Sequence, residues 1–139
     1  MTTATLLRTA AGLAAVQGIA HGTLFLRAKP RHGPAEIAVI QAMQSKRFDF
    51  AGATRSYWDF YIGYGLEAAA ACVVEAVLFW QLARMAQSQP ALVRPTVVLF
   101  VLVNIGHALL AARYFFYVPI VFDLLIAFCL GAACVTAAQ

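Results

Sequence analysis

The chain has 139 residues, of which 63% are hydrophobic and 12% are charged, with a formal net charge of +4. A soluble domain carries about 25% charged residues, and a chain this short cannot bury several long apolar helices within itself, so these figures argue against a soluble globular protein. Six of the ten lysines and arginines lie between Arg27 and Arg55, in one polar segment beside the apolar runs, which argues against nucleic-acid binding.

The first predicted element is a transmembrane helix over residues 6–26. Its apolar run is long enough to cross a bilayer, because about 20 residues rising about 1.5 Å each span about 30 Å. The run is also compatible with a cleaved signal peptide, since Arg8 precedes an apolar stretch that contains small residues. We expect a retained helix.

A polar loop is predicted over residues 27–56. Within it, Gly33-Pro34-Ala35-Glu36 is typical of a helix start, with proline in the first turn and an early acid. This predicts a short helix over residues 34–44, lying on the membrane surface.

Three further transmembrane helices are predicted over residues 57–83, 96–116 and 120–138. The first of these opens with an aromatic cluster typical of the membrane interface, and Pro119 separates the last two. Short connections imply antiparallel neighbours, so the expected fold is all-α: an integral membrane four-helix bundle with up-down-up-down topology, forming one transmembrane domain. The excess of lysine and arginine on the side of the long loop predicts that this loop is cytoplasmic.

The first and third helices resemble each other in sequence. Each carries isoleucine, a small residue, histidine and a second small residue, followed six positions after the histidine by arginine; the histidines are His21 and His107 and the arginines Arg27 and Arg113. Histidine and arginine are scarce in this chain, so their match carries more weight than matched alanines. The pattern predicts a 2+2 internal repeat with the two histidines at similar depth.

Ionisable residues at membrane depth form the predicted site, because charge inside a bilayer is costly and marks functional positions. We expect Glu67, near the middle of its helix, to act with His21 or His107 as a catalytic acid–base pair. The predicted ligand-binding residues lie in the same half of the bundle: Asp59, Tyr61, Tyr64, Asn104, Arg113 and Asp123. Glu75 lies toward the opposite half.

Structural roles remain alternatives for these residues. Asp59 and Arg113 are near enough to the headgroups to anchor their helices, and Asp123 is placed to neutralise Arg113 across the short third connection. Either histidine is also compatible with a simple hydrogen bond between helices.

Three functions are compatible with this pattern. The first is a pocket that binds, and isomerises or otherwise transforms, a lipophilic small molecule. The second is a b-type haem protein with His21 and His107 as axial ligands, although no cofactor or other metal site is predicted outright. The third is a non-catalytic subunit or scaffold. The expected partners are membrane lipids and a hydrophobic small molecule, with a homo-oligomer or a larger membrane complex left open, as is enzymatic activity.

Three segments also carry a resemblance to a protein group. They are the run Arg55-Ser56-Tyr57-Trp58-Asp59-Phe60-Tyr61-Ile62-Gly63-Tyr64-Gly65, the triplet Ala20-His21-Gly22, and Arg113-Tyr114-Phe115-Phe116-Tyr117-Val118-Pro119. Together they resemble small, uncharacterised bacterial four-helix inner-membrane proteins. The resemblance implies a four-helix fold and a multi-pass location in the bacterial inner membrane, and it implies no activity.

Overall fold

Four long helices make up most of the protein, as seen in a computed structural model that describes residues 1–137. They are α1 (Thr3–Leu26), α3 (Tyr57–Met85), α4 (Pro90–Tyr114) and α5 (Tyr117–Thr136). A shorter helix, α2 (Pro34–Ser45), and a hairpin of β1 (Arg47–Phe50) and β2 (Ala53–Ser56) connect α1 to α3. All four long helices are long and apolar enough to cross a membrane, which indicates a multi-pass membrane protein.

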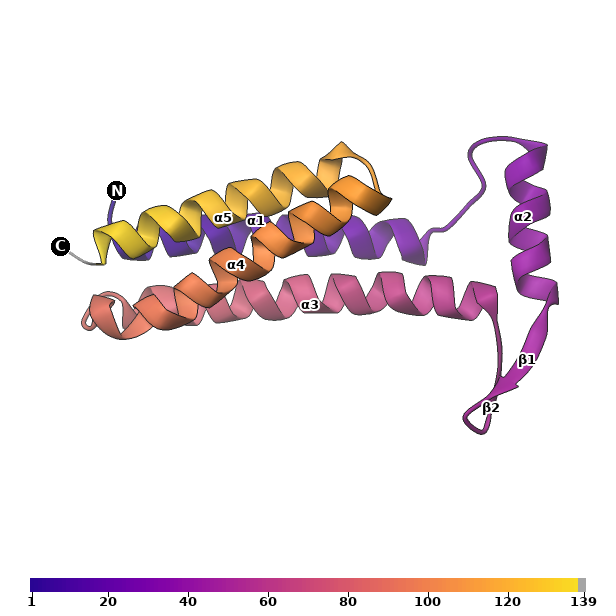
Figure 1. Ribbon diagram of the computed structural model, residues 1–139, viewed down its shortest axis with the longest axis horizontal. Coiled ribbons are helices and arrows are strands. Elements are labelled where there is room, and N and C mark those ends of the chain that lie inside the picture. Colours follow the sequence, from indigo (N-terminus) through magenta and orange to yellow (C-terminus); the bar gives the residue numbers. More distant parts are fainter. Residues whose placement is uncertain (138–139) are drawn as a thin grey trace.

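The predicted four-helix, up-down-up-down bundle is confirmed. Figure 1 shows the long helices alternating in direction, with both chain ends at one end of the bundle and α2 lying crosswise at the other. A hydrogen bond of 2.9 Å between the hydroxyls of Thr3 and Thr136 joins the beginning of α1 to the end of α5.

Several helix boundaries differ by a few residues from those predicted, and two of them lie beside prolines. The third long helix begins at Pro90 rather than at residue 96, and the fourth begins at Tyr117 rather than at residue 120. Proline lacks an N–H, but the first turn of a helix leaves its N–H groups unpaired, so Pro90 and Pro119 fit inside these first turns. The predicted end of the fourth span, Ala138, lies outside the described residues.

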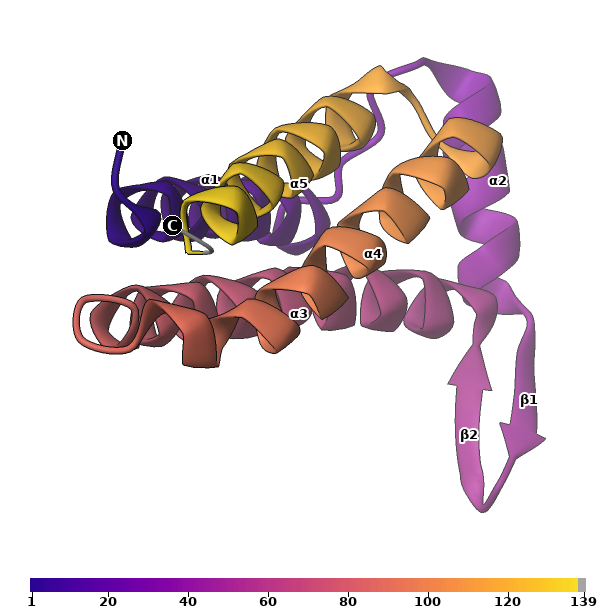
Figure 2. The ribbon, with the colours of Figure 1, turned by 60° about the vertical axis from the view of Figure 1, so that its left-hand side comes forward.

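The hydrophobic core lies in the half of the bundle that holds the chain ends. α1 packs between α3 and α5, and α5 packs along α4, whereas α4 meets α3 mainly beside the turn that connects them. Figure 2 shows α4 diverging from α3 toward the end that carries α2. The largest side chains of this core that are fully buried are Leu7, Phe79, Ile126, Leu130, Val93 and Val97, all at most 1% exposed.

The internal repeat remains a prediction. The predicted repeat relates α1 to α4 and α3 to α5. It therefore requires the contact between α3 and α4 to match the contact between α1 and α5. In the described residues α1 and α5 pack closely along each other, whereas the contact between α3 and α4 is slight.

Gly18 sets the closeness of α1 and α3. A Cβ atom added at Gly18 would lie 3.0 Å from Cys72 Cβ and 3.1 Å from the Ala69 carbonyl oxygen, whereas one added at Gly12 would meet nothing within 4 Å. Small residues allow membrane helices to approach closely, and overfilling such a contact costs about 1–3 kcal/mol.

We therefore expect Gly18→Val to lower the thermal unfolding midpoint in detergent, while Gly12→Val leaves it almost unchanged. Valine alters the intrinsic helix preference of α1 at both positions, so the difference between the two variants isolates the packing effect. Equal midpoints would contradict this account of the α1–α3 contact.

The loop between α1 and α3 is more structured than predicted. The helix expected over residues 34–44 is present as α2, and its Glu36 carboxylate accepts hydrogen bonds from the backbone N–H groups of His32, at 2.6 Å, and Arg31. These bonds hold the pKa of Glu36 below its ordinary value.

The β1–β2 hairpin was not predicted. Ala51 and Gly52, the two residues of its turn, both have positive φ, as a two-residue turn of the type I′ class requires. Phe48 and Phe50 lie on one face of the hairpin, where both rings pack near Phe60 at the start of α3, at centroid distances of 6.0 and 6.1 Å.

Candidate functional site

Each of the four long helices contributes a polar side chain to one level of the bundle. We call this group the inner polar layer; its members are Gln17 from α1, Glu75 from α3, Asn104 and His107 from α4, and Asp123 from α5. It lies on the side of the hydrophobic core that faces α2. Three of the five, Asn104, His107 and Asp123, were predicted site residues.

Asp123 is held by α1. It is 5% exposed, and its carboxylate accepts a hydrogen bond of 3.0 Å from the Gln17 side-chain amide. The predicted partner, Arg113, lies elsewhere: it is exposed, with its guanidinium 5.5 Å from the ring of Tyr114. An interhelical hydrogen bond therefore satisfies Asp123 in the described structure, and Arg113 is placed to anchor the end of α4.

Glu75 and His107 form the more open side of the layer. Asn104 is 1% exposed, and its amide donates a hydrogen bond of 2.9 Å to the Phe100 carbonyl and lies within hydrogen-bonding reach of Glu75. His107 lies near Glu75 and Asp123, although among the described residues no ion pair within 4 Å joins it to either carboxylate. Glu75 is half-buried and His107 is exposed, so an imidazole and a carboxyl group reach the surface of the bundle at membrane depth.

An aromatic pair lies where the hydrophobic core meets this layer. Phe79 lies one helical turn after Glu75, and Phe100 lies one turn before Asn104. Their rings meet edge to face, with centroids 5.2 Å apart. The pair marks the place where α3 and α4 are still in contact.

His21 belongs to a different group of side chains. It is half-buried and packs against Phe25, with ring centroids 4.9 Å apart, and Phe25 in turn packs against Tyr61 at 5.2 Å. Gly65 lies against the Phe25 ring, which occupies the space that a Cβ would take. This group joins α1 to the interfacial end of α3, where Trp58 continues it.

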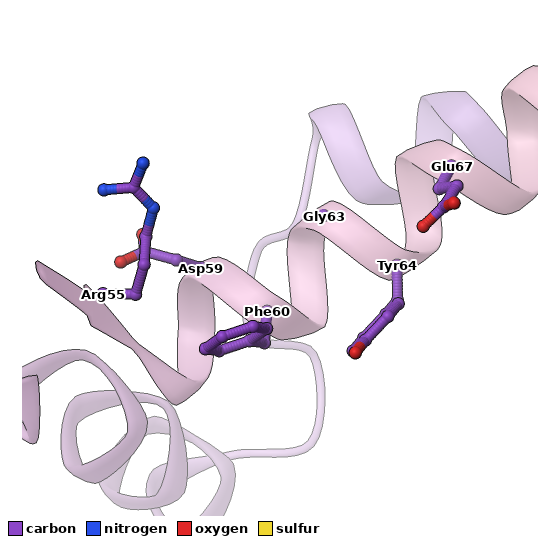
Figure 3. Close-up of a pocket in the computed structure, with 6 residues that line it drawn as sticks. All are labelled: Arg55, Asp59, Phe60, Gly63, Tyr64 and Glu67. Atoms are coloured by element: carbon purple, nitrogen blue, oxygen red, sulfur yellow. The ribbon is translucent and has the colours of Figure 1, made fainter. Parts of the chain in front are cut away.

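Glu67 lies on the outer face of α3. Gly65 and Ala69 are buried toward α1, and a residue midway between them is turned by about 200° from each, to the opposite face of the helix. Figure 3 shows Glu67 and Tyr64 lining a surface pocket of about 300 Å³ together with Asp59, Arg55, Phe60 and Gly63.

The structure therefore divides the predicted site into three groups and leaves Arg113 apart from them: His21 and Tyr61 belong to the Phe25 group described above. Glu67, Asp59 and Tyr64 share the outer pocket, whereas His107, Asn104 and Asp123 share the inner polar layer. The proposed pairing of Glu67 with a histidine remains a prediction without a described contact. Asp59 already serves α3, because its carboxylate accepts a hydrogen bond of 2.8 Å from the Ser56 backbone N–H.

Two members of the layer, Gln17 and Glu75, were missed as site residues. Glu75 was set aside because it lies toward the far end of α3, but it follows Cys72 by three residues and precedes Phe79 by four, which places it on the inward face of the helix. Gln17 shares the inward face of α1 with Ala14 and Gly18. Helical periodicity relates both residues to their inward neighbours once the inward face is known, but these helices are apolar all round and the sequence carries no signal for that face.

Neither histidine has surroundings that identify a metal. Within residues 1–137 there is no group of three or more histidine, cysteine, aspartate or glutamate side chains arranged to hold a metal ion. The haem alternative, which needs His21 and His107 as a pair, remains a prediction. The absorption spectrum of protein expressed with adequate haem tests it through the presence of a Soret band.

Comparison with known proteins adds no relative. No protein-family model, curated protein or solved structure matches the chain. What the chain shows by itself is a small membrane protein with four candidate spans and polar side chains inside its bundle.

Proposed function

We propose that the protein binds a lipophilic small molecule at the inner polar layer, with the polar head of that molecule between α3 and α4. The observation that carries the proposal is the exposure of His107 and the partial exposure of Glu75 at membrane depth. In hydrocarbon, no water is present to satisfy these groups, and an ionisable residue there costs about 2.5–3.5 kcal/mol on insertion scales. A ligand with hydrogen-bonding groups at its head would supply the missing partner.

The divergence of α4 from α3 supports the same location. The two helices touch near Phe79 and Phe100 and then separate on the side where Glu75 and His107 lie (Figure 2). An apolar body would lie against the exposed aliphatic side chains on the His107 side of α4, which include Leu99 and Leu110. The polar head would meet the carboxyl group of Glu75 and the imidazole of His107, with the buried Asn104 behind them.

These groups would also allow proton exchange with a bound molecule. Carboxyl and imidazole groups are the side chains most used for general acid–base chemistry, and Glu75 and His107 lie near each other in the layer. Gln17 and Asn104 would position the carboxyl groups rather than exchange protons themselves, because amides do not titrate in this range. Isomerisation of the bound molecule is one reaction that such a pair serves.

The test is to purify the protein from its native membrane in polymer-bounded nanodiscs and to analyse the extracted molecules by mass spectrometry. We expect a non-phospholipid, lipophilic molecule in near-stoichiometric amount. Glu75→Gln and His107→Ala should lose it, while Glu67→Gln, a matched change on the outer face of the same helix, should retain it. Circular dichroism would verify that each variant keeps its helices.

Three outcomes would contradict the proposal. Loss of the molecule in Glu67→Gln alone would place the site in the outer pocket of Figure 3. Equal retention of the molecule in all three variants would show that it binds neither at the inner polar layer nor in the outer pocket. A fixed protein partner in place of any small molecule would favour the scaffold alternative.

A further inference from the structure

A second surface feature lies where the β1–β2 hairpin meets the start of α3. A surface pocket of about 370 Å³ is lined there by Arg47, Arg55, Trp58, Asp59, Ile62 and Gly63. It is separate from the inner polar layer, since Gly63 and Glu75 are twelve positions apart on α3, about 18 Å along the helix axis.

Two arginine side chains converge at this pocket. Arg55 donates a hydrogen bond of 2.9 Å to the Thr54 carbonyl oxygen, and Arg47 donates one of 3.4 Å to the same oxygen. A guanidinium group has five N–H donors, so most of the donors of both side chains are left for another partner. Among the described residues the one ion pair within 4 Å joins His32 to Glu36, and neither arginine takes part in it.

The nearby acids are engaged in local structure. The Asp49 carboxylate accepts a hydrogen bond of 2.6 Å from the Thr54 hydroxyl, and the Asp59 carboxylate accepts one from the Ser56 backbone N–H. These bonds fix the hairpin and the first turn of α3. The Asp59 carboxylate also lines the pocket and lies near both guanidinium groups, so the two arginines leave the pocket with one net positive charge for an incoming anion.

The surroundings of the pocket place it at the membrane–water interface. Tyr57, Tyr61 and Tyr64 are exposed around the same turns of α3, as expected of an interfacial belt. α3 has 29 residues and is about 43 Å long, more than the hydrocarbon thickness of about 30 Å, so its first turns reach the headgroup level. Phe50, 62% exposed at the tip of the hairpin, is placed to dip into the lipid surface.

We propose that this pocket binds the phosphate-bearing headgroup of an anionic phospholipid. Arg47 and Arg55 would hold the phosphate, because guanidinium groups match phosphate oxygens in pairs. Ile62 and the Trp58 ring would border the first part of the acyl chains. Gly63 keeps the pocket open, since no atom lies within 4 Å of the position that its Cβ would take.

The test uses Trp58 as the reporter. The chain has two tryptophans, so Trp80→Phe leaves Trp58 as the single fluorophore. Detergent-solubilised protein is titrated with brominated phosphatidylglycerol or brominated phosphatidylcholine, whose bromines quench tryptophan on contact. We expect phosphatidylglycerol to reach half-maximal quenching at a lower mole fraction than phosphatidylcholine. Each arginine should contribute about fivefold to this difference, because a basic residue at an anionic surface contributes about 1 kcal/mol.

Three matched double variants test whether Arg47 and Arg55 cause the preference for phosphatidylglycerol. Arg47→Gln with Arg55→Gln should abolish the preference for phosphatidylglycerol, and Arg47→Lys with Arg55→Lys, which keeps both charges, should restore part of it. Lys29→Gln with Arg31→Gln removes the same charge elsewhere in the loop and should leave the preference intact. All four positions are exposed, so these changes do not open the core.

The proposal fails if both lipids quench equally, if the lysine pair behaves as the glutamine pair does, or if the Lys29 and Arg31 control loses the preference as well. Addition of inorganic phosphate distinguishes the source of the anion. A lipid site should keep its quenching in millimolar phosphate, whereas full displacement would assign the pocket to a free anion and overturn the lipid proposal.

Discussion

Replacement of Phe79 by alanine is expected to destabilise the bundle more than any other single truncation considered for this protein. Phe79 is fully buried and meets Phe100 edge to face at 5.2 Å, beside the turn that connects α3 to α4. Truncation of a buried phenylalanine costs about 3–5 kcal/mol, through lost contacts and the cavity that remains. In a membrane, the loss of packing contacts makes up the larger part of this free-energy cost, because lipid is as apolar as the core of the bundle.

The matched control is Phe128→Ala on α5, where the ring is 74% exposed. Unfolding of both variants by denaturant in mixed micelles gives their free energies of unfolding relative to the unmodified chain. We expect a loss at Phe79 several times that at Phe128. Similar losses at the two positions would show that the Phe79–Phe100 contact does not hold α3 to α4.

The second prediction concerns the hydrogen bond between Gln17 and Asp123. Gln17→Leu leaves the buried Asp123 carboxylate without its partner, and a buried polar group left unpaired costs about 1–3 kcal/mol. Gln17→Leu combined with Asp123→Leu removes both groups. We expect the double variant to regain most of the stability lost in the single variant, because replacing both partners by apolar groups is nearly neutral.

A double-mutant cycle measures this coupling directly. The free energies of unfolding of the two single variants, the double variant and the unmodified chain are compared under identical conditions. Additive losses would contradict the account, since they would mean that Gln17 and Asp123 act independently. The ligand assay proposed for Glu75 would then show whether the double variant, although stable, has lost binding.

The bundle could be predicted from the sequence because lipid imposes a simple rule on it. Apolar runs of about 20 residues must be helices, since every backbone polar group inside hydrocarbon needs a partner in its own segment. The boundaries at Pro90 and Tyr117 were harder, because proline both begins helices and ends them. The hairpin had a signal in the alternation Arg47-Phe48-Asp49-Phe50 before Ala51-Gly52, but Ala-Gly is a weaker turn signal than Asn-Gly.

The site was harder to predict, because the prediction rested on how deep each residue lies in the membrane and not on which face of its helix it occupies. Glu67 and Glu75 are eight residues apart on α3, and depth alone favoured Glu67. The structure turns Glu67 outward and Glu75 toward Asn104, a distinction that depends on which face of α3 meets its neighbours. Hydropathy carries no information on that face in helices that are apolar all round.

The hydrogen bond between Thr3 and Thr136 has a consequence for biosynthesis. α1 and α3 can pair as soon as both have left the ribosome, but the other neighbour of α1 is α5, the last of the four helices to be made. Until α5 arrives, the side of α1 that carries Gln17 has no partner and faces lipid or the insertion machinery. The inner polar layer therefore cannot be complete until α5 has been made, and we expect a nascent chain arrested before Asp123 to hold α1 and α3 together without it.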